Sequence, residues 1–293
     1  MSERKALRPE AEGLASALPP LMAAAERLAA SVLTGGHGRA RAGRGEEFWQ
    51  FRAATAGDAM RQIDWRRSAR SDQSFVRETE WQSAQSVLIW VDPSQAMGFA
   101  GAGAQHPPKS HTARLLALAL AILLLRGGER VGLLEPALPA GAGLVQRERL
   151  YQALTALGAD ADYGSPPEGP LPARGRVVLI SDFFADPGAF QAFLERAAGQ
   201  GVRGALVQLL DPVEQAFPFA GRTLFESMSG ALRHETLQAN DLRSAYLARL
   251  EERQSLLADM AAAAGWQFHA HSTGAPAAAA LLWLYRALEQ GAG

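Results

Sequence analysis

Residues 86–92 read Ser-Val-Leu-Ile-Trp-Val-Asp, a continuous apolar run that ends in Asp92. An unbroken run of this length predicts a strand buried on both faces, and such strands belong to parallel sheets that helices cover. Residues 176–181 repeat the pattern as Arg-Val-Val-Leu-Ile-Ser, and Asp182 follows them. These two runs predict an α/β fold with a mostly parallel sheet at its centre.

Apolar periodicity extends this alternation of strands and helices along the chain. Helical spacing covers residues 111–126, 146–157, 187–200, 239–264 and 277–288, and further strands are expected at 130–135, 204–210 and 266–270. We therefore expect a doubly wound sheet with helices on both faces and right-handed crossovers.

Three segments divide the chain. Residues 1–36 form an N-terminal helical segment, because apolar residues recur at helical spacing over 21–33. Residues 37–85 differ in character, with many glycines, arginines and aromatics and little periodicity. Residues 86–293 carry the α/β domain, and the broken pattern near 211–236 predicts a hairpin-type insertion within it.

The composition excludes several classes of protein. Of 293 residues, 48% are hydrophobic and 20% are charged, which is typical of a globular protein with a substantial core. The chain has no cysteine, which excludes disulfides, cysteine-ligated zinc, iron–sulfur clusters and thiol catalysis. The formal charge of −1 excludes a polycation. The longest apolar run, 115–125, is too short to span a bilayer and no secretory signal is recognised, so we expect a cytoplasmic protein.

Polar side chains flank the ends of both apolar strands. Ser94 follows Asp92 closely, and Ser181 directly precedes Asp182. Open α/β sheets bind ligands at the carboxyl ends of their strands. If the two strands are neighbours, carboxylate and hydroxyl oxygens converge there and suit a hard cation such as Mg²⁺ or Mn²⁺. The alternative is that both aspartates cap the following helices or accept hydrogen bonds from loop amides.

The loop after the first strand, residues 92–97, reads Asp-Pro-Ser-Gln-Ala-Met. It resembles the Asp-x-Ser-x-Ser-Met loop of von Willebrand factor A-like domains, which supplies part of a metal-ion-dependent adhesion site. By this resemblance the metal ligands would be Asp92, Ser94 and Asp182.

The chain departs from that pattern at two places. Ala96 stands where the family loop has a second serine, and residues 135–145 contain no threonine or serine that could be a further ligand. The expected Mg²⁺ or Mn²⁺ site is therefore incomplete. Water would fill the remaining positions, or a carboxylate from a substrate or partner would complete the metal's ligands.

A second motif of glycines, arginines, acids and aromatics precedes the sheet. It comprises Gly43, Arg44, Gly45, Glu47, Phe48, Arg52, Gly57, Asp58, Arg61, Ile63, Asp64, Trp65, Ala69 and Arg70. Together with the loop at 92–97, it resembles the family labelled domain of unknown function 58 (DUF58), whose members carry a von Willebrand A-like, Rossmann-like fold. The resemblance implies a partner of the MoxR type of AAA ATPase, and a role in the assembly or regulation of another complex.

The arginine-rich segment, residues 39–77, holds nine arginines and five acids, with aromatic side chains between them. Arginine beside aromatics can bind single-stranded nucleic acid. The alternation of signs favours ion pairing within the segment instead. The expected arginines are Arg52, Arg61 and Arg70, and the expected acids are Glu47, Asp58 and Asp64. The pairing predicts that the indole of Trp65 is buried against the sheet, and that nucleic acid is not the partner.

We therefore expect a non-catalytic protein-interaction module whose contact surface lies around Asp92, Ser94 and Asp182. One alternative is an Mg²⁺-dependent hydrolase that uses Asp92 and Asp182, but no histidine lies near either loop in the sequence to act as a base. The other alternative is single-stranded nucleic-acid binding by the arginine-rich segment. No residue is assigned a catalytic role.

Overall fold

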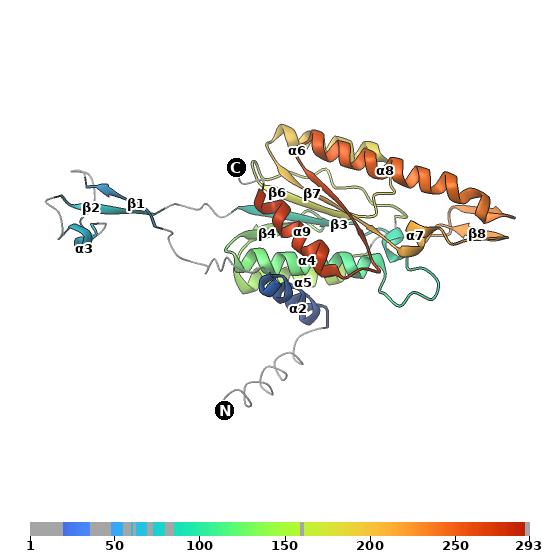
Figure 1. Cartoon of the computed structure of the whole chain (residues 1–293), viewed down its shortest axis with the longest axis horizontal. Coiled ribbons are helices and arrows are strands. Elements are labelled where there is room, and N and C mark those ends of the chain that lie inside the picture. The colour runs from blue at the N-terminus through green and yellow to red at the C-terminus, as the bar shows by residue number, and fades with distance from the viewer. Residues whose placement is uncertain are drawn as a thin grey trace, which may run out of the picture. The chain divides into compact units, whose positions relative to one another are not determined.

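The computed structural model describes residues 20–35, 48–54, 60, 63–68, 73–79, 85–158 and 161–290. The chain divides into two compact units, one made of Met1–Gly38 with Gln85–Gly293 and the other of Arg39–Ala84. The larger unit holds a central sheet with its helices, and the smaller unit holds a pair of strands and a short helix (Figure 1).

Six strands form the central sheet, in the order β10-β7-β6-β3-β4-β5. Their bounds are β3 (Ser86–Val91), β4 (Arg130–Leu133), β5 (Leu138–Gly141), β6 (Arg176–Ser181), β7 (Arg203–Leu210) and β10 (Gln267–Ser272). All neighbours are parallel except β4 and β5, which are antiparallel. The expected α/β fold with a mostly parallel sheet is confirmed.

The core lies in two layers, one on each face of the sheet. Along β6, Val178 and Ile180 belong to one layer while Val177 and Leu179 belong to the other, because successive side chains of a strand point to opposite faces. The first layer includes side chains of α2 (Pro20–Gly35), α4 (Lys109–Arg126), α5 (Gly143–Ala156) and α9 (Ala277–Gln290). The second includes side chains of α6 (Pro187–Gly199) and α8 (Arg243–Ala263).

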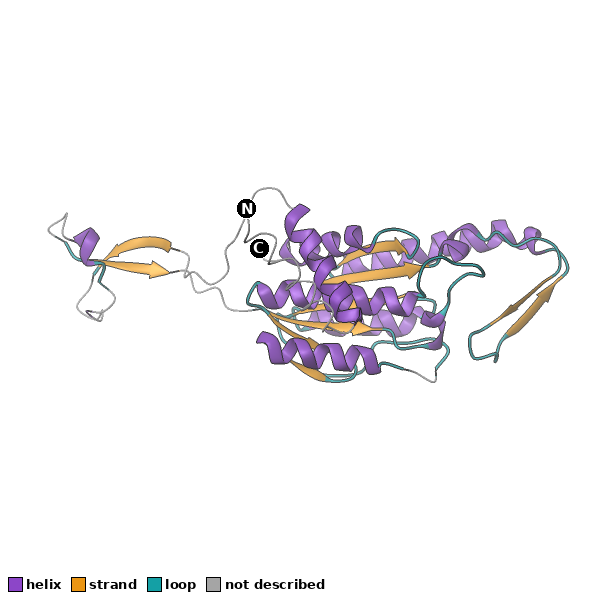
Figure 2. Cartoon of the chain, turned by 90° about the horizontal axis from the view of Figure 1, so that it is seen from below, coloured by secondary structure: helices purple, strands orange, loops and turns teal. Residues whose placement is uncertain are grey.

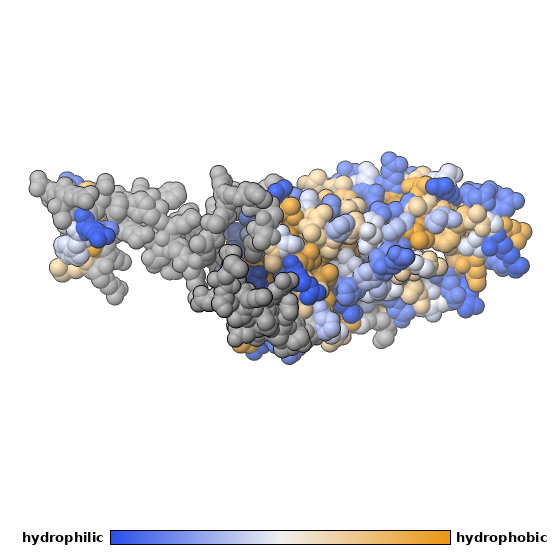
Figure 3. Space-filling model, turned by 60° about the horizontal axis from the view of Figure 1, so that its bottom comes forward, coloured by the Kyte–Doolittle hydropathy of each residue, from blue (hydrophilic) through white to orange (hydrophobic). Residues whose placement is uncertain are grey.

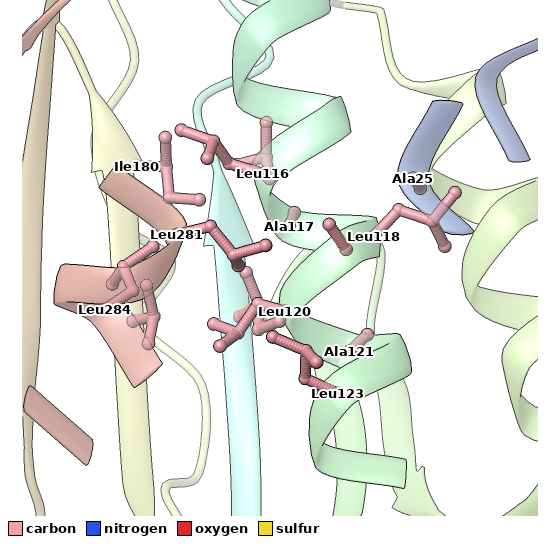
Figure 4. Packing of buried hydrophobic residues seen from close by; sticks show 14 of the residues in the cluster. Ala25, Leu116, Ala117, Leu118, Leu120, Ala121, Leu123, Ile180, Leu281 and Leu284 are labelled. Atoms are coloured by element: carbon pink, nitrogen blue, oxygen red, sulfur yellow. The ribbon is translucent and has the colours of Figure 1, made fainter. Parts of the chain in front are cut away.

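Over residues 115–125, helix α4 is apolar on all sides, and other elements surround it there. Residues 116–124 are all buried, and the helix contacts α2, α5 and α9 as well as the sheet. Figure 4 shows Leu118 directed toward Ala25 of α2, while Leu116 lies near Ile180 of the sheet and Leu281 of α9. This packing fixes the start of α4 against the carboxyl edge of the sheet.

Two connections differ from the sequence-based expectation. Residues 138–141 form β5, a short edge strand whose Pro139 and absence of β-branched residues carry no strand signal. The long helix expected at 239–264 begins as a 3-10 turn, η3 (Ala239–Leu242), before α8.

The segment after β7 contains both a helix and a hairpin. Helix α7 (Pro212–Ala216) comes first, and the antiparallel strands β8 (Thr223–Glu226) and β9 (Arg233–Thr236) follow it. Figure 2 shows the hairpin as a separate pair of strands beyond the end of the central sheet.

The topological switch point of the sheet lies between β3 and β6. From β3 the chain crosses through α4 to β4 on one side, and it later enters β6 on the other side. The two strands pair from Val87 opposite Arg176 to Val91 opposite Ile180. Asp92 and Asp182 therefore leave neighbouring strands at the same edge, which is where ligands bind in open α/β sheets.

The smaller unit pairs β1 (Phe48–Ala53) with β2 (Phe75–Thr79), and α3 (Trp65–Ser68) joins them. The hydroxyl of Ser68 donates to the carbonyl of Asp64 at 2.8 Å and accepts the N–H of Phe75 at 2.9 Å, so it ties α3 to β2. Trp65 is 57% exposed, so the smaller unit does not itself bury the indole.

Candidate functional site

Asp92 and Asp182 lie side by side at the carboxyl edge of the sheet, as the pairing of β3 with β6 requires. Both residues are buried, with 2% and 1% of their surface exposed. The condition under which the sequence predicted converging oxygens is thus met. The two carboxylates nevertheless have different partners, and this difference decides what the site can do.

The carboxylate of Asp92 is held by hydrogen bonds within its own surroundings. Its Oδ1 accepts the backbone N–H of Ser94 at 2.8 Å, and its Oδ2 accepts the hydroxyl of Ser181 at 2.6 Å. Burial raises the pKa of Asp92, although hydrogen bonds from Ser181 and Ser94 oppose the rise. A Cβ added at Gly164 would come within 2.1 Å of Oδ1, so backbone covers this carboxylate.

The carboxylate of Asp182 is paired with a lysine that the sequence analysis did not single out. Lys109 is the first residue of α4, and its Nζ lies 2.8 Å from Oδ2 of Asp182. The same ammonium donates to Oε1 of Glu214 at 2.7 Å. Lys109 is only 1% exposed, so the three residues form a buried triad of one cation and two anions.

Burial and charge act in opposite directions on Lys109. Burial, the largest influence, lowers the pKa of the ammonium, but attraction to Asp182 and Glu214 outweighs it and the pKa ends above its ordinary value. In Glu214, burial raises the pKa of the carboxyl and the nearby Lys109 reduces the rise without cancelling it. The lysine is therefore charged at neutral pH.

A capping box fixes Glu214 in place. Oδ1 of Asp211 accepts the N–H of Val213 at 2.8 Å, and Oε2 of Glu214 accepts the N–H of Asp211, also at 2.8 Å. This reciprocal arrangement satisfies donors at the start of α7. It leaves Oε1 of Glu214 free to accept the lysine, so the local structure of α7 orients the acid.

The predicted ligands, Asp92, Ser94 and Asp182, do not fit Mg²⁺ or Mn²⁺ in this arrangement. Oδ2 of Asp182 already accepts the ammonium of Lys109 at 2.8 Å and its Oδ1 accepts the N–H of Phe184 at 3.1 Å, so both oxygens that would bind the metal are occupied. Both oxygens of Asp92 likewise accept hydrogen bonds, from the N–H of Ser94 and the hydroxyl of Ser181, and of the three predicted ligands the buried Ser94 hydroxyl alone has no partner within the described part of the chain. Over the same residues, no group of three or more histidines and acids is placed to hold a metal ion.

A pocket of about 370 Å³ opens beside the triad. Its floor includes Lys109, Asp182 and Glu214, and its walls come from the loop after β3, from α7 and from the β8–β9 hairpin. The aromatic side chains that line it are Phe99, Tyr163, Phe184, Phe217, Phe219, Phe225 and Tyr246. Aromatic side chains therefore outnumber charged ones in the lining, where Asp162 and Glu226 accompany the triad.

The aromatic wall is built around Phe217. Its ring lies 5.5 Å from that of Phe225 and 4.7 Å from that of Tyr246, measured between centroids. Phe217 ends α7 with a φ of 41°, a left-handed conformation that a bulky residue adopts only at a cost. Such outliers cluster at functional sites, where the surrounding structure holds them. Burial raises the pKa of the Tyr246 phenol to about 12.

Only part of the glycine- and arginine-containing motif at 43–70 lies within the described residues. Phe48 and Arg52 lie in β1, Ile63 and Asp64 precede α3, and Trp65 begins it. The positions outside the described residues are Gly43, Arg44, Gly45, Glu47, Gly57, Asp58, Arg61, Ala69 and Arg70. The predicted ion pairs involve these positions and the side chain of Arg52, and they stay a prediction.

One sequence signal could have identified Lys109. It is one of two lysines in a chain that otherwise carries arginine, and it stands at the start of a strongly apolar helix. A cation in the first turn opposes the helix dipole, so its presence there indicates an acidic partner. Which acid it meets depends on Asp182 and Glu214, which lie 73 and 105 residues away in the sequence.

Comparisons with known proteins give a family and a set of distant structural neighbours. A family model described as "Protein of unknown function DUF58" matches residues 50–255. No curated protein matches the chain.

Three solved structures share a distant likeness with this chain. An aerotolerance-related membrane protein from Bacteroides fragilis is 15% identical, with 71% of this chain and 100% of that one covered at a TM-score of 0.43. The conserved hypothetical protein BatB from Bacteroides thetaiotaomicron is 14% identical, with 71% and 98% covered at 0.41. An uncharacterized membrane spanning protein from Vibrio fischeri is 13% identical, with 72% and 100% covered at 0.21.

The expected cytoplasmic location is corrected by this comparison, since two of these solved proteins are described as membrane proteins. The expectation rested on the absence of an apolar span from the sequence. Among the described residues, no helix is both long and apolar enough to cross a membrane. Proteins also associate with membranes without a span, so that absence was no basis for a location.

Proposed function

The chain belongs to the DUF58 family, and from this premise we propose that it is a non-catalytic protein-interaction module with a von Willebrand A-like fold. Its partner is an AAA ATPase of the MoxR type, and the two act in the assembly or regulation of another complex. The resemblance of the loop at 92–97 and of the motif at 43–70 supports both parts of the proposal.

The observation that carries the proposal is the pocket at the carboxyl edge of the sheet. It lies at the switch point between β3 and β6, where folds of this kind bind their ligands. The hairpin that forms one wall also exposes Leu224, Met228 and Leu232, and of these Met228 lines the pocket. An open aromatic pocket beside exposed apolar side chains is typical of a protein contact site.

The contact surface works without a divalent cation. Lys109 supplies a permanent positive charge to Asp182, which a metal would otherwise have to supply. The capping box of α7 and the first turn of α4 both hold this charge in place. The adhesion-type site of the resemblance is thus replaced by an internal ion pair.

The same geometry supports a binding role over hydrolysis. A hydrolase at Asp92 and Asp182 needs a base near the carboxylates. His106, which the fold brings to this end of the sheet, instead has its Nε2 at 3.6 Å from Asp211 and its Nδ1 at 3.4 Å from the hydroxyl of Thr273. These contacts anchor the loop between β3 and α4.

A binding titration tests the proposed partnership. The fluorescently labelled chain is titrated with the MoxR-type ATPase of the same organism in Mg-ATP, and anisotropy is followed. We expect Phe225→Ala, which removes one ring of the pocket wall, to weaken binding by about tenfold or more. The matched control is Leu256→Ala, at an exposed position of α8, which should bind as the wild type does. Absence of a complex with the wild type, or equal binding by both variants, would contradict the proposal.

Calorimetry tests separately the proposal that the contact surface works without a divalent cation. Mn²⁺ is titrated into the wild type and into Asp92→Ala. We expect no saturable heat from either protein at millimolar metal. Saturable binding to the wild type that Asp92→Ala abolishes would show a working adhesion-type site, and the role given to Lys109 would be wrong.

A further inference from the structure

We propose that the pocket beside Lys109 binds a basic side chain, an arginine or a lysine, that the protein partner presents. This inference rests on the proposed function and deepens it, because it assigns the chemistry of the partner's contact group. A metal-based adhesion site takes a carboxylate from its partner, so the internal lysine reverses the expected charge.

The charges that line the pocket favour a cation. On the floor, two carboxylates of Asp182 and Glu214 face one ammonium, which leaves an excess negative charge. Asp162 and Glu226 add two further acids to the lining. The guanidinium of Arg233 pairs with Glu226 at 2.7 Å, and the negative excess therefore comes from the other acids.

Burial strengthens this preference. Burial is the main reason why the pKa of Glu214 stays raised, Lys109 opposes the rise, and the neighbouring charge of Asp182 adds to it. A second positive charge entering from the pocket would relieve that cost. A carboxylate entering the same space would add to it, so an acidic contact group is disfavoured.

The aromatic walls favour a cation as well. Lys109 itself illustrates this, since its Nζ lies 5.7 Å from the ring centre of Phe99 and 5.3 Å from that of Phe184. Phe217, Phe225 and Tyr246 present further rings to the same space. Aromatic faces attract ammonium and guanidinium groups, and several rings around one cavity form a cage for them. Guanidinium also stacks on rings and binds carboxylates through two N–H groups, which favours arginine.

The size and surroundings of the pocket suit a single side chain. Its volume of about 370 Å³ is at the small end of the range for ligand sites. The exposed Met228 of the hairpin lines the pocket and would cover the chain beside the basic residue. Figure 3 shows apolar and polar residues mixed at the end of the larger unit.

Small amide probes test the inference without the ATPase. The wild type, labelled with ¹³C at its methionine methyls, is titrated with N-acetyl-arginine amide, and the Met228 methyl signal is followed. The matched probe is N-acetyl-citrulline amide, which has nearly the same shape and no charge, and N-acetyl-glutamate amide is the anionic probe. We expect saturable shifts with arginine and about tenfold weaker binding of citrulline, because the charge is lost.

Variants locate the binding in the pocket. Glu214→Gln removes a floor charge and should weaken the arginine probe by about tenfold. Its control, Glu289→Gln, changes an exposed acid at the far end of α9 and should leave the affinity unchanged. If Glu214→Gln does not fold, Phe225→Leu removes one ring of the wall and should weaken the same probe several-fold.

Three results would overturn the inference. They are equal binding of arginine and citrulline, tighter binding of the glutamate probe, and no shift at Met228 with any probe at millimolar concentration. If arginine fails while the ATPase binds, the basic contact group is wrong and the proposed function stands. If arginine binds while the ATPase does not, the pocket chemistry stands and the proposed partnership is wrong.

Discussion

The Nζ of Lys109 lies 2.8 Å from Oδ2 of Asp182, although 73 residues separate the two in the sequence. The contact joins the first turn of α4 to the end of β6, and Glu214 extends it to α7. A buried positive charge thus links three elements at the carboxyl edge of the sheet. Its consequences can be measured without knowledge of the partner.

Removal of the lysine should destabilise the fold strongly. Lys109→Ala leaves Asp182 and Glu214 buried without their cation, which typically costs about 3–5 kcal/mol in the free energy of unfolding. The measurement is urea denaturation at neutral pH. Arg222→Ala is the control, since it breaks an exposed pair with Glu235 and should cost less than about 1 kcal/mol. Equal losses in the two variants would show that the triad is not structural.

Substitution by asparagine should change the free energy of unfolding differently at Asp182 and at Asp92. Asp182→Asn removes a carboxylate that pairs with Lys109, and it should lower the free energy of unfolding by about 1–3 kcal/mol. Asp92→Asn keeps an acceptor for Ser94 and a polar contact with Ser181 while it removes a buried charge, and it should leave stability at pH 7 equal or higher. Thermal unfolding of both variants decides the matter, and a large loss in Asp92→Asn would contradict the account.

Stability should fall as the pH rises from acid toward neutral because of two carboxyls. Burial raises the pKa of Asp92 and of Glu214 in the folded state above the ordinary values of 3.8 and 4.5. Above those values the folded chain keeps protons that the unfolded chain has lost, so their contribution to stability decreases through this window. Asp92→Asn should flatten part of the slope of the urea midpoint against pH. An unchanged slope would show that Asp92 does not titrate in this window.

The raised pKa of Lys109 predicts that the fold loses stability at alkaline pH. Its folded value lies above the ordinary 10.5, so its stabilising contribution is complete below that pH and is lost as the pH rises through the folded value. Unfolding midpoints at alkaline pH should therefore decrease more steeply in the wild type than in Lys109→Met. Parallel curves for the two proteins would argue against a charged lysine in the triad.

The backbone that covers Asp92 should not tolerate a methyl group. In Gly164→Ala the added Cβ would lie 2.1 Å from Oδ1 of Asp92, so the loop must shift at a cost of about 1–3 kcal/mol. Gly169→Ala is the matched control, because a Cβ there meets nothing within 4 Å. It should be neutral or slightly stabilising, since alanine reduces the freedom of the unfolded chain. Chemical denaturation of the pair checks the difference.

Local pattern accounts for most of the fold. The strands at 86–91 and 176–181 follow from unbroken apolar runs, which favour strands buried on both faces. Edge strand β5 could not be predicted, because its pairing with β4 depends on position rather than on its own residues. The exposure of Trp65 within the smaller unit could not be predicted for a similar reason, since an aromatic residue signals burial only where a neighbour covers it.

Apolar patterning alone predicts the α/β class, the two buried strands and the acids, Asp92 and Asp182, that follow them. The pairing of the two strands, and the choice of Asp182 rather than Asp92 as the acid beside Lys109, follow from the packing of the whole domain. The reason is physical: apolar periodicity acts over a few residues, whereas an ion pair forms between whichever charges the packing brings together. Helix α4 and the capping box of α7 bring Lys109 and Glu214 to Asp182. No local sequence pattern predicts this contact.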